Sequence, residues 1–513
     1  MLINRREFVN LGLTATAGTL ACPFNLLASV SSADLAADPR RPQFHLLPAA
    51  NWMNDPNGPV FWNGHYHMFH QYNPNAAVWG DMHWAHAVSP DMLHWRHLPI
   101  AFVPNPNGAD AAGCFTGTAV VDVNRVVVLY TGVVNTNHDP NGAPAFKESQ
   151  CIATASDPDL TQWIQDPVPV IAAPPAGLDV TGFRDPTPWR QGDTWYLAVG
   201  SGIRGHGGAV LLYRSPDLRH WEYMHMLAHG APTASSASDP VASGDMWECP
   251  DFFPLGEKHV LIYSTQGETF WQSGTLDTAT LFFRSERSGI LDYGSFYAPK
   301  TQLDPLGRRI LWGWIPETRP QSEYSAAGWA GLMSLPRVLT LDAAGDLCIA
   351  LLPEFDRLRA NQQLIRFTGD EIQDRRDREK LAAITLHEAC GEIAVSIGNI
   401  SESVEVALVS AGDPSKTWLT CRYDPARPNV ALIDNQPVRT GAGRSTIAVE
   451  LLFIIDGSVI ECFANGCGTL TKRFYYPGAS APAIAVQVNG SLKNLSALSI
   501  AQINPISPNR LTT

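Results

Sequence analysis

One short motif recurs three times in this 513-residue chain, and its spacing constrains the fold more than any other feature. The copies read "SPDMLHW", "SDPDLTQW" and "SPDLRHW", at residues 89–95, 156–163 and 215–221. They stand roughly 60 to 70 residues apart, which suits four-stranded propeller blades with long loops on one face. Runs such as "HYHMFHQY" and "RVVVLYTGV", bounded by Gly, Pro, Asn and Asp, have the alternation of antiparallel strands. We therefore predict about five blades.

The composition of the sequence changes after "WAGLMSLPRVLTL". A charged stretch, "FTGDEIQDRRDREK", follows, and the repeated motif does not recur. Strand patterns then resume, with a turn at Asp456-Gly457. We place the boundary near residue 355. The predicted fold is all-β: a five-bladed β-propeller over residues 42–352, followed by a C-terminal β-sandwich over residues 360–510.

The N-terminal residues have the composition of an export signal. "NRREFVN" is a twin-arginine region, an apolar stretch follows it, and "SSADLAAD" offers small residues for cleavage. We expect residues 1–37 to be this signal, the mature protein to be periplasmic or extracellular, and no membrane association after signal removal. The net charge of -13 and the absence of a basic run argue against a nucleic-acid partner. The sequence gives no indication of the oligomeric state.

Cysteines and histidines indicate neither a metal site nor a cofactor. Eight cysteines follow the signal without the spacing of metal ligands, and buried thiols are the simplest interpretation. Cys390, Cys421, Cys462 and Cys467 nevertheless fall close enough together to allow a bridge. Seven histidines gather in the first predicted blade, but they are spread over several strands and loops. These histidines are His65, His67, His70, His83, His86, His94 and His97.

Three acidic residues stand out in the first domain: Asp55 in "NWMNDPNG", Asp185 in "FRDPTPW" and Glu248 in "MWECPDFFP". The proline after each aspartate is expected to bias the acid's backbone toward an extended conformation. Because the innermost strand of each blade borders the central channel, acids one or two blades apart can converge at one end of it.

Each acid also has a purely structural interpretation, since aspartate before proline begins many turns. The neighbouring aromatic, amide and guanidinium side chains favour a site instead. Carboxylates beside aromatic platforms suit glycoside cleavage, in which one acid attacks or stabilises and another protonates the leaving oxygen. The apolar neighbours of Glu248 are expected to raise its pKa, which suits a proton donor.

These motifs together resemble glycoside hydrolase family 32, which comprises invertases, inulinases, levanases and fructan exohydrolases. The resemblance rests on "NWMNDPNG", "HQYNP", "CFTGTAV", "FRDP", "WECPDFF", "DYGSFYAPK" and "LMSLPRVL". It covers nearly the whole mature chain, in the order of the family. It implies a five-bladed propeller followed by a β-sandwich, in agreement with the pattern above, and retaining hydrolysis of terminal β-D-fructofuranosides without a cofactor.

The resemblance also implies roles for individual residues. Asp55 matches the nucleophile, Asp185 the transition-state stabiliser and Glu248 the acid/base. Thr116 stands where the family usually has serine, so the hydroxyl is kept and a methyl is added. The positions that resemble the fructose-binding subsite are Asn54, Gln71, Trp79, Phe115, Thr116 and Arg184.

Two alternatives to hydrolysis stay open at this point. One is transfer of fructose to another sugar, and the other is a carbohydrate-binding propeller without turnover. Since both Asp55 and Glu248 are present, an enzyme is favoured over a binding module. The sequence does not distinguish sucrose, inulin and levan as substrates.

Overall fold

The computed structural model describes residues 30–136, 146–231, 239–367, 376–381, 384–398, 402–441, 447–489 and 492–511. The predicted export signal therefore lies outside the described residues except at its end. There helix α2 (Ser32–Ala37) buries Leu35 in a cluster with Leu47, Ile315 and Trp329. No helix in the described ranges is long and apolar enough to cross a membrane.

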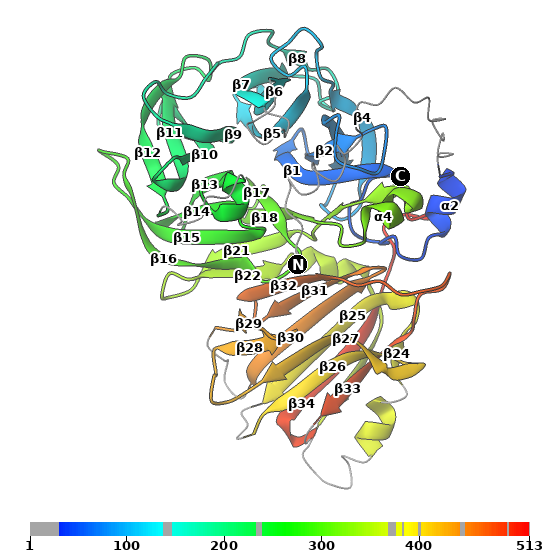
Figure 1. The fold of residues 1–513 in the computed structure, drawn as a ribbon. Coiled ribbons are helices and arrows are strands. Elements are labelled where there is room, and N and C mark those ends of the chain that lie inside the picture. The colour runs from blue at the N-terminus through cyan, green and yellow to red at the C-terminus, as the bar shows by residue number, and fades with distance from the viewer. Residues whose placement is uncertain are drawn as a thin grey trace.

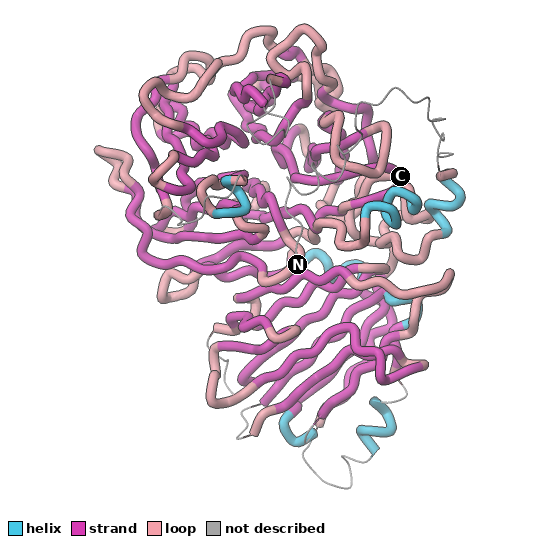
Figure 2. Tube along the Cα trace, viewed as in Figure 1, coloured by secondary structure: helices cyan, strands magenta, loops and turns pink. Residues whose placement is uncertain are grey.

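Strands dominate both halves of the molecule, and the helices are short (Figure 2). The first half is a ring of five sheets, and the second half packs beside it (Figure 1). The other helical segments that the structure describes are α3 (Pro240–Ser243), α4 (Gln321–Ala327), η1 (Pro353–Leu358), η2 (His387–Ala389), η3 (Leu492–Asn494) and a helical turn at 376–381.

Each of the five blades is built mainly from strands that follow one another in the sequence. Blade 1 contains β1 (Asn51–Trp62), β2 (His65–Asn73), β3 (His83–Ser89) and β4 (Arg96–Phe102). Blade 2 contains β5 (Gly113–Asp122), β6 (Arg125–Asn135), β7 (Phe146–Ala155) and β8 (Ile164–Gln165). Blade 3 contains β9 (Val180–Gln191), β10 (Thr194–Ile203), β11 (Gly207–Ser215) and β12 (Glu222–His229).

The remaining blades close the ring. Blade 4 contains β13 (Glu248–Leu255), β14 (Lys258–Thr265), β15 (Glu268–Leu276) and β16 (Phe283–Asp292). Blade 5 contains β17 (Tyr297–Leu303), β18 (Arg309–Ile315), β20 (Leu332–Met333), β21 (Arg337–Leu341) and β22 (Leu347–Leu351). The first strands of the blades contact one another in the order β1, β5, β9, β13, β17 and back to β1. Strand β19 (Trp329–Ala330) pairs in parallel with β1 and so joins the last blade to the first.

The repeated motif forms the turn between the third and fourth strands of blades 1, 2 and 3. In blade 3, Asp217 accepts hydrogen bonds from the backbone N–H groups of Arg219 and His220, and the Trp221 indole donates to the Leu218 carbonyl. Asp91 and Asp157 cap the equivalent turns of blades 1 and 2. The motif is thus a turn in which one carboxylate satisfies two backbone donors.

The second domain is a sandwich of two six-stranded antiparallel sheets with one apolar core between them. The predicted all-β fold, a five-bladed propeller followed by a β-sandwich, is confirmed. One sheet contains β23 (Arg359–Arg366), β25 (Cys390–Gly398), β30 (Ile447–Asp456), β31 (Val459–Ala464), β32 (Gly468–Arg473) and β34 (Leu495–Ile503). The other contains β24 (Thr385–Leu386), β26 (Val404–Ser410), β27 (Asp413–Tyr423), β28 (Val430–Ile433), β29 (Gln436–Arg439) and β33 (Ile484–Asn489).

A buried polar network joins the two domains. Arg337 of blade 5 contacts Asp292 of blade 4 at 2.8 Å and Glu461 of the sandwich at 2.7 Å. His45, ahead of the first blade, contacts Asp456 at 2.8 Å and Glu461 at 3.0 Å. All five side chains are fully buried, so each charge depends on the partners that this interface supplies.

Candidate active site

Every innermost strand carries a β-bulge in its N-terminal half or at its middle, which places two residues opposite one on the neighbouring strand. Bulges re-aim side chains and interrupt the ladder, and they are common beside active sites. Three of these bulges contain a proline. The proline removes no hydrogen bond between the strands, because a bulged residue is left out of the strand pairing. The bulged pairs are residues 54 and 55 in β1, 115 and 116 in β5, 185 and 186 in β9, 249 and 250 in β13, and 298 and 299 in β17.

The bulges hold most of the residues predicted for the site. Asn54, Asp55, Phe115, Thr116 and Asp185 lie within them, and Arg184 and Glu248 directly precede them. The remaining two predicted residues, Gln71 and Trp79, lie in β2 and in the loop after it. One recurring backbone irregularity therefore gathers side chains from four blades.

The backbone of Asp185 is not extended, so that expectation is wrong for this residue. Its φ is +65°, in the left-handed region, and the residues at the same bulge position in the next two blades, Cys249 and Ala298, have φ values of +49° and +51°. The geometry of the bulge thus overrides the local preference that proline imposes on its neighbour.

Cys249 contacts two of the three acids and directly follows the third in the chain. Its Sγ lies 3.3 Å from Asp185 Oδ2 and 3.7 Å from Asp55 Oδ2, and its backbone N–H donates to the same Asp185 oxygen at 2.9 Å. Glu248 is its neighbour in the chain. The carboxyl groups of Asp55, Asp185 and Glu248 come from residues that are at most 1% exposed. The structure thus brings together three acids that the sequence separates.

Polar side chains fix the Asp55 carboxylate on both oxygens. Asn54 Nδ2 donates to Oδ1 at 2.8 Å, and the Thr116 hydroxyl donates to Oδ2 at 2.5 Å. Gln71 connects these two partners, because its Nε2 donates to Thr116 and its Oε1 accepts from Asn54. The Trp52 indole N–H donates a hydrogen bond to Asn54 Oδ1 and so fixes the orientation of Asn54. The added methyl of Thr116 therefore leaves its hydroxyl in place.

The carboxyl group of Glu248 is not in the largely apolar surround expected from the sequence. Arg184 donates to Oε1 from both Nε and Nη2, at 3.0 and 2.7 Å, and the Tyr297 hydroxyl donates to Oε2 at 2.8 Å. The expectation is wrong because the nearest polar groups come from blades 3 and 5, far from Glu248 in the sequence. Trp247 and Phe252 instead join an apolar cluster between blades 3 and 4.

Arg184 bridges two acids. Its Nη1 contacts Glu148 at 2.9 Å, while its other nitrogens contact Glu248. Burial alone would lower the pKa of Arg184, but Glu148, Glu248 and Asp185 together raise it well above its ordinary value. The guanidinium thus stays charged and holds Glu248 in one orientation.

Aromatic side chains lie beside the acids. The rings of Trp79 and Phe115 meet edge to face with centroids 5.8 Å apart, and Phe146 meets Phe115 at 5.6 Å. Trp79 is only partly buried, whereas Phe115 is 5% exposed. These rings offer an apolar face on which a sugar ring can stack.

Sequence reasoning missed two residues that contact members of the predicted site. Tyr297 lies inside "DYGSFYAPK", a motif that resembles the family but points to no role for this tyrosine, and its hydroxyl donates to Glu248. Glu148 lies in "KESQ" of β7, where no pattern distinguishes it from an ordinary strand acid. Only its contact with Arg184 identifies it.

Histidines and acids do not gather into a metal site in the part of the chain that the structure describes. No group of three or more His, Cys, Asp or Glu side chains there could hold a metal ion. In blade 1, His67 Nδ1 and His86 Nε2 lie 2.9 Å apart, and burial lowers the pKa of His67 to about 4 and that of His70 to about 3. These histidines are packed as neutral core side chains.

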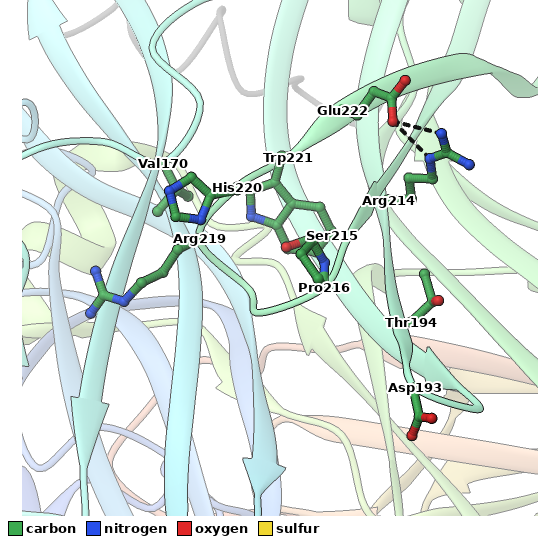
Figure 3. Close-up of a pocket in the computed structure, with 10 residues that line it drawn as sticks. All are labelled: Val170, Asp193, Thr194, Arg214, Ser215, Pro216, Arg219, His220, Trp221 and Glu222. Atoms are coloured by element: carbon green, nitrogen blue, oxygen red, sulfur yellow. Dashed lines mark hydrogen bonds and ion pairs between the residues drawn. The ribbon is translucent and has the colours of Figure 1, made fainter.

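A pocket of about 630 Å³ lies elsewhere, at the turn that the repeated motif forms in blade 3 (Figure 3). Arg214 and Glu222 in it pair with each other at 2.7 Å, and Arg219 pairs with Asp166. Because its charges are already paired and none of the predicted site residues lines it, the acids at the bulges make the stronger candidate site.

Comparison with known proteins agrees with this architecture. Residues 45–350 match the Glycosyl hydrolases family 32 N-terminal domain, and residues 386–502 match the Glycosyl hydrolases family 32 C terminal domain. The raffinose invertase of Escherichia coli is 37% identical over 451 residues, covering 85% of this chain and 89% of that protein. The sucrose-6-phosphate hydrolase of the same species is 40% identical over 337 residues, covering 63% of this chain and 67% of that protein.

Solved structures show the same likeness. Fructan 1-exohydrolase IIa of Cichorium intybus superposes with a TM-score of 0.71 at 27% identity, covering 91% of this chain and 98% of that one. The β-fructofuranosidase of Bombyx mori gives 0.69 at 27% identity, covering 93% and 97%.

The fold and the three converging carboxyl groups thus define a glycoside hydrolase. The matches over both domains show that the chain belongs to glycosyl hydrolases family 32.

Proposed function

We propose that this protein hydrolyses terminal, non-reducing β-D-fructofuranosides with retention of configuration. The observation that carries the proposal is the contact of Cys249 with both Asp55 and Asp185, with Glu248 as its neighbour in the chain. Burial raises the pKa of the Cys249 thiol, and the charges of Asp185, Asp55 and Glu248 raise it further, so all three carboxyl groups lie near this one thiol. A retaining glycosidase needs two of them about 5 to 5.5 Å apart.

The proposed reaction has two steps. Asp55 attacks the anomeric carbon of fructose while Glu248 donates a proton to the leaving oxygen, which gives a fructosyl ester on Asp55. Glu248 then takes a proton from water, which attacks the same carbon and releases fructose. The hydrogen bonds from Asn54 and Thr116 to Asp55 hold the nucleophile in place for both steps.

Asp185 has a different proposed role, as a transition-state stabiliser. Its Oδ2 already accepts the Cys249 N–H, so the carboxylate is fixed at the edge of the site. There it can accept hydrogen bonds from fructose hydroxyl groups, and these strengthen as the ring gains positive charge.

The proposed substrate class follows from the site and from the relatives. The Bombyx mori enzyme has been solved as a variant with sucrose, and the Cichorium intybus enzyme as a variant with 1-kestose. Both ligands end in a fructosyl unit. In this chain the partly exposed Trp79 and the amide and hydroxyl groups of Asn54, Gln71 and Thr116 suit a neutral, hydroxyl-rich ring.

Product analysis tests the proposal. Wild-type protein should release fructose from sucrose, inulin or levan, and the first-formed fructose should be the β-anomer when followed by NMR. Asp55→Asn, which is nearly isosteric, should lower the rate on the order of a thousandfold or more while circular dichroism stays unchanged.

The outcomes also separate the alternatives. Longer fructosyl products in place of free fructose would identify a transferase, and binding without any turnover would identify a carbohydrate-binding propeller. An inverted first product, or near-normal activity in folded Asp55→Asn, would overturn the assignment of Asp55.

A further inference from the structure

We propose that Cys348 and Cys467 are an oxidative modification site, at which an intramolecular disulfide links the propeller to the sandwich. Cys348 lies in β22, the last strand of blade 5, and Cys467 lies in the turn between β31 and β32. Their Sγ atoms are 3.1 Å apart, although 119 positions separate them in the sequence. Both are present as thiols. A bond of about 2.05 Å needs the sulfurs to approach by only about 1 Å more.

The backbone around Cys467 is shaped to accept this neighbour. The Cys467 N–H donates to the Ala464 carbonyl at 2.9 Å, which fixes the turn. A Cβ added at Gly441 would lie 2.6 Å from Cys467 Sγ, and Gly441 has a φ of +64°. Glycine at this position therefore supplies both the backbone conformation and the space that the sulfur occupies.

Ion pairs hold the two domains together beside the thiols. Arg439, at the end of β29 in the sandwich, contacts Asp342 at 3.3 Å and Asp346 at 3.4 Å, both in the turn before β22. Its Nη2 also lies 3.9 Å from Cys348 Sγ. The pair of thiols thus lies in a contact that is already fixed, so the bond can form without a domain rearrangement.

Accessibility distinguishes Cys467 from all the other described cysteines except Cys390, while its neighbour Cys348 is buried. Cys467 is partly exposed, whereas Cys114, Cys151, Cys249, Cys421 and Cys462 are buried. Burial also raises the pKa of each of these five thiols. The hydrogen bond with Cys467 and burial raise the pKa of Cys348 too, so the short distance between the two sulfurs, and not thiol acidity, singles out the pair. The sequence suggested a bridge within the group Cys390, Cys421, Cys462 and Cys467. In this proposal only Cys467 of that group forms a bridge, and its partner lies in the first domain.

The chemistry needs a two-electron oxidant, which we take to be a small-molecule disulfide. The thiolate of Cys467 attacks one sulfur of that disulfide, which forms a mixed disulfide and releases one thiol. The thiolate of Cys348 then attacks Cys467 Sγ and releases the second thiol. The two cysteines lose two electrons and two protons, and the oxidant gains both. The product closes a long loop across the domain interface, which stabilises the folded state.

The test uses the full chain, treated with oxidised glutathione or with a phosphine reductant. After oxidation, non-reducing peptide mapping by mass spectrometry should find the Cys348 and Cys467 peptides joined. The number of thiols titrated in denaturant should fall by two, and the thermal midpoint should be higher than in the reduced protein by about 2–5 °C. Activity should not change, because Cys348 lies in the outermost strand of blade 5, whereas the three acids lie in innermost strands of other blades.

Variants separate this site from general thiol oxidation. Cys348→Ser and Cys467→Ser should each abolish the linked peptide and the shift in midpoint, while Cys390→Ser, which changes another partly exposed thiol, should preserve both. Oxidised wild-type protein in which Cys348 and Cys467 still alkylate, or in which Cys467 keeps glutathione or joins another cysteine, would overturn the proposal. This measurement uses wild-type protein, so it tests the proposal even if a variant fails to fold.

Discussion

The side chains around Asp55 form a closed hydrogen-bonded set from two blades. Asn54 and Thr116 each donate to one carboxylate oxygen, and Gln71 ties the two donors together. Sequence motifs identified all four residues, because each lies in a motif that resembles the family. Glu148 and Tyr297 escaped prediction, since their roles exist only through contacts with residues of other blades.

We expect the hydroxyl of Thr116, and not its methyl, to matter for catalysis. Thr116→Val keeps the shape but removes the donor to Asp55 Oδ2. A hydrogen bond to a charged group contributes about 1.5–3 kcal/mol, so kcat/KM on sucrose should fall about 10- to 100-fold. Thr116→Ser is the matched control and should stay within about threefold of the wild type. Equal activities of the valine and serine variants would contradict this role.

The turn recurs in all five blades, although its sequence motif is recognisable in only three. In blades 4 and 5, Asp277 and Asp342 still accept two backbone N–H groups at the same connection. Those turns lack the tryptophan that made the other copies recognisable. The five bulges were likewise invisible, because a bulge depends on the register with the next strand and not on the residues of one strand.

The turn of blade 2 offers a test within one motif. When the three copies are aligned on their tryptophans, Asp159 matches Asp91 and Asp217. The residue that caps the turn is nevertheless Asp157, whose carboxylate accepts hydrogen bonds from the N–H groups of Thr161 and Gln162. Asp157→Ala should lower the free energy of unfolding by about 1 kcal/mol, measured by urea denaturation. Asp159→Ala, an exposed neighbour, should change it by less than about 0.5 kcal/mol. A larger loss of stability in Asp159→Ala than in Asp157→Ala would show that the cap is assigned to the wrong residue.

At the scale of the whole molecule, the two domains share one buried set of charges. Asp456 and Glu461 of the sandwich surround His45, and Glu461 also pairs with Arg337 of blade 5. The sequence predicted both domains from their strand patterns. It could not predict this interface, because more than 400 residues separate His45 from its partners.

The interface should make stability depend on pH. Burial alone would lower the pKa of His45, but the hydrogen bonds to Asp456 and Glu461 raise it to about 9, above its ordinary value of 6.5. The charged histidine therefore stabilises the fold fully below pH 6.5, and this contribution disappears as pH rises through 9.

A variant isolates this contribution. His45→Gln should lower the free energy of the first unfolding transition in urea more at about pH 6 than at about pH 10, by on the order of 3 kcal/mol. His220→Gln, which removes an exposed histidine paired with Asp217, should show little difference between the two pH values. A pH-independent effect of His45→Gln would mean that this histidine is not held in its charged form.

The central claim is that Asp55 attacks the sugar while Glu248 serves as acid and base, and trapping the intermediate tests it most directly. Glu248→Gln should still form the fructosyl enzyme from an activated fructoside, whose leaving group needs little protonation, but should hydrolyse it slowly without a base. Peptide mapping by mass spectrometry after rapid acid quenching should then find one fructosyl group on the peptide that contains Asp55. A fructosyl group on Asp185, or turnover of the activated fructoside without any covalent adduct, would contradict the account.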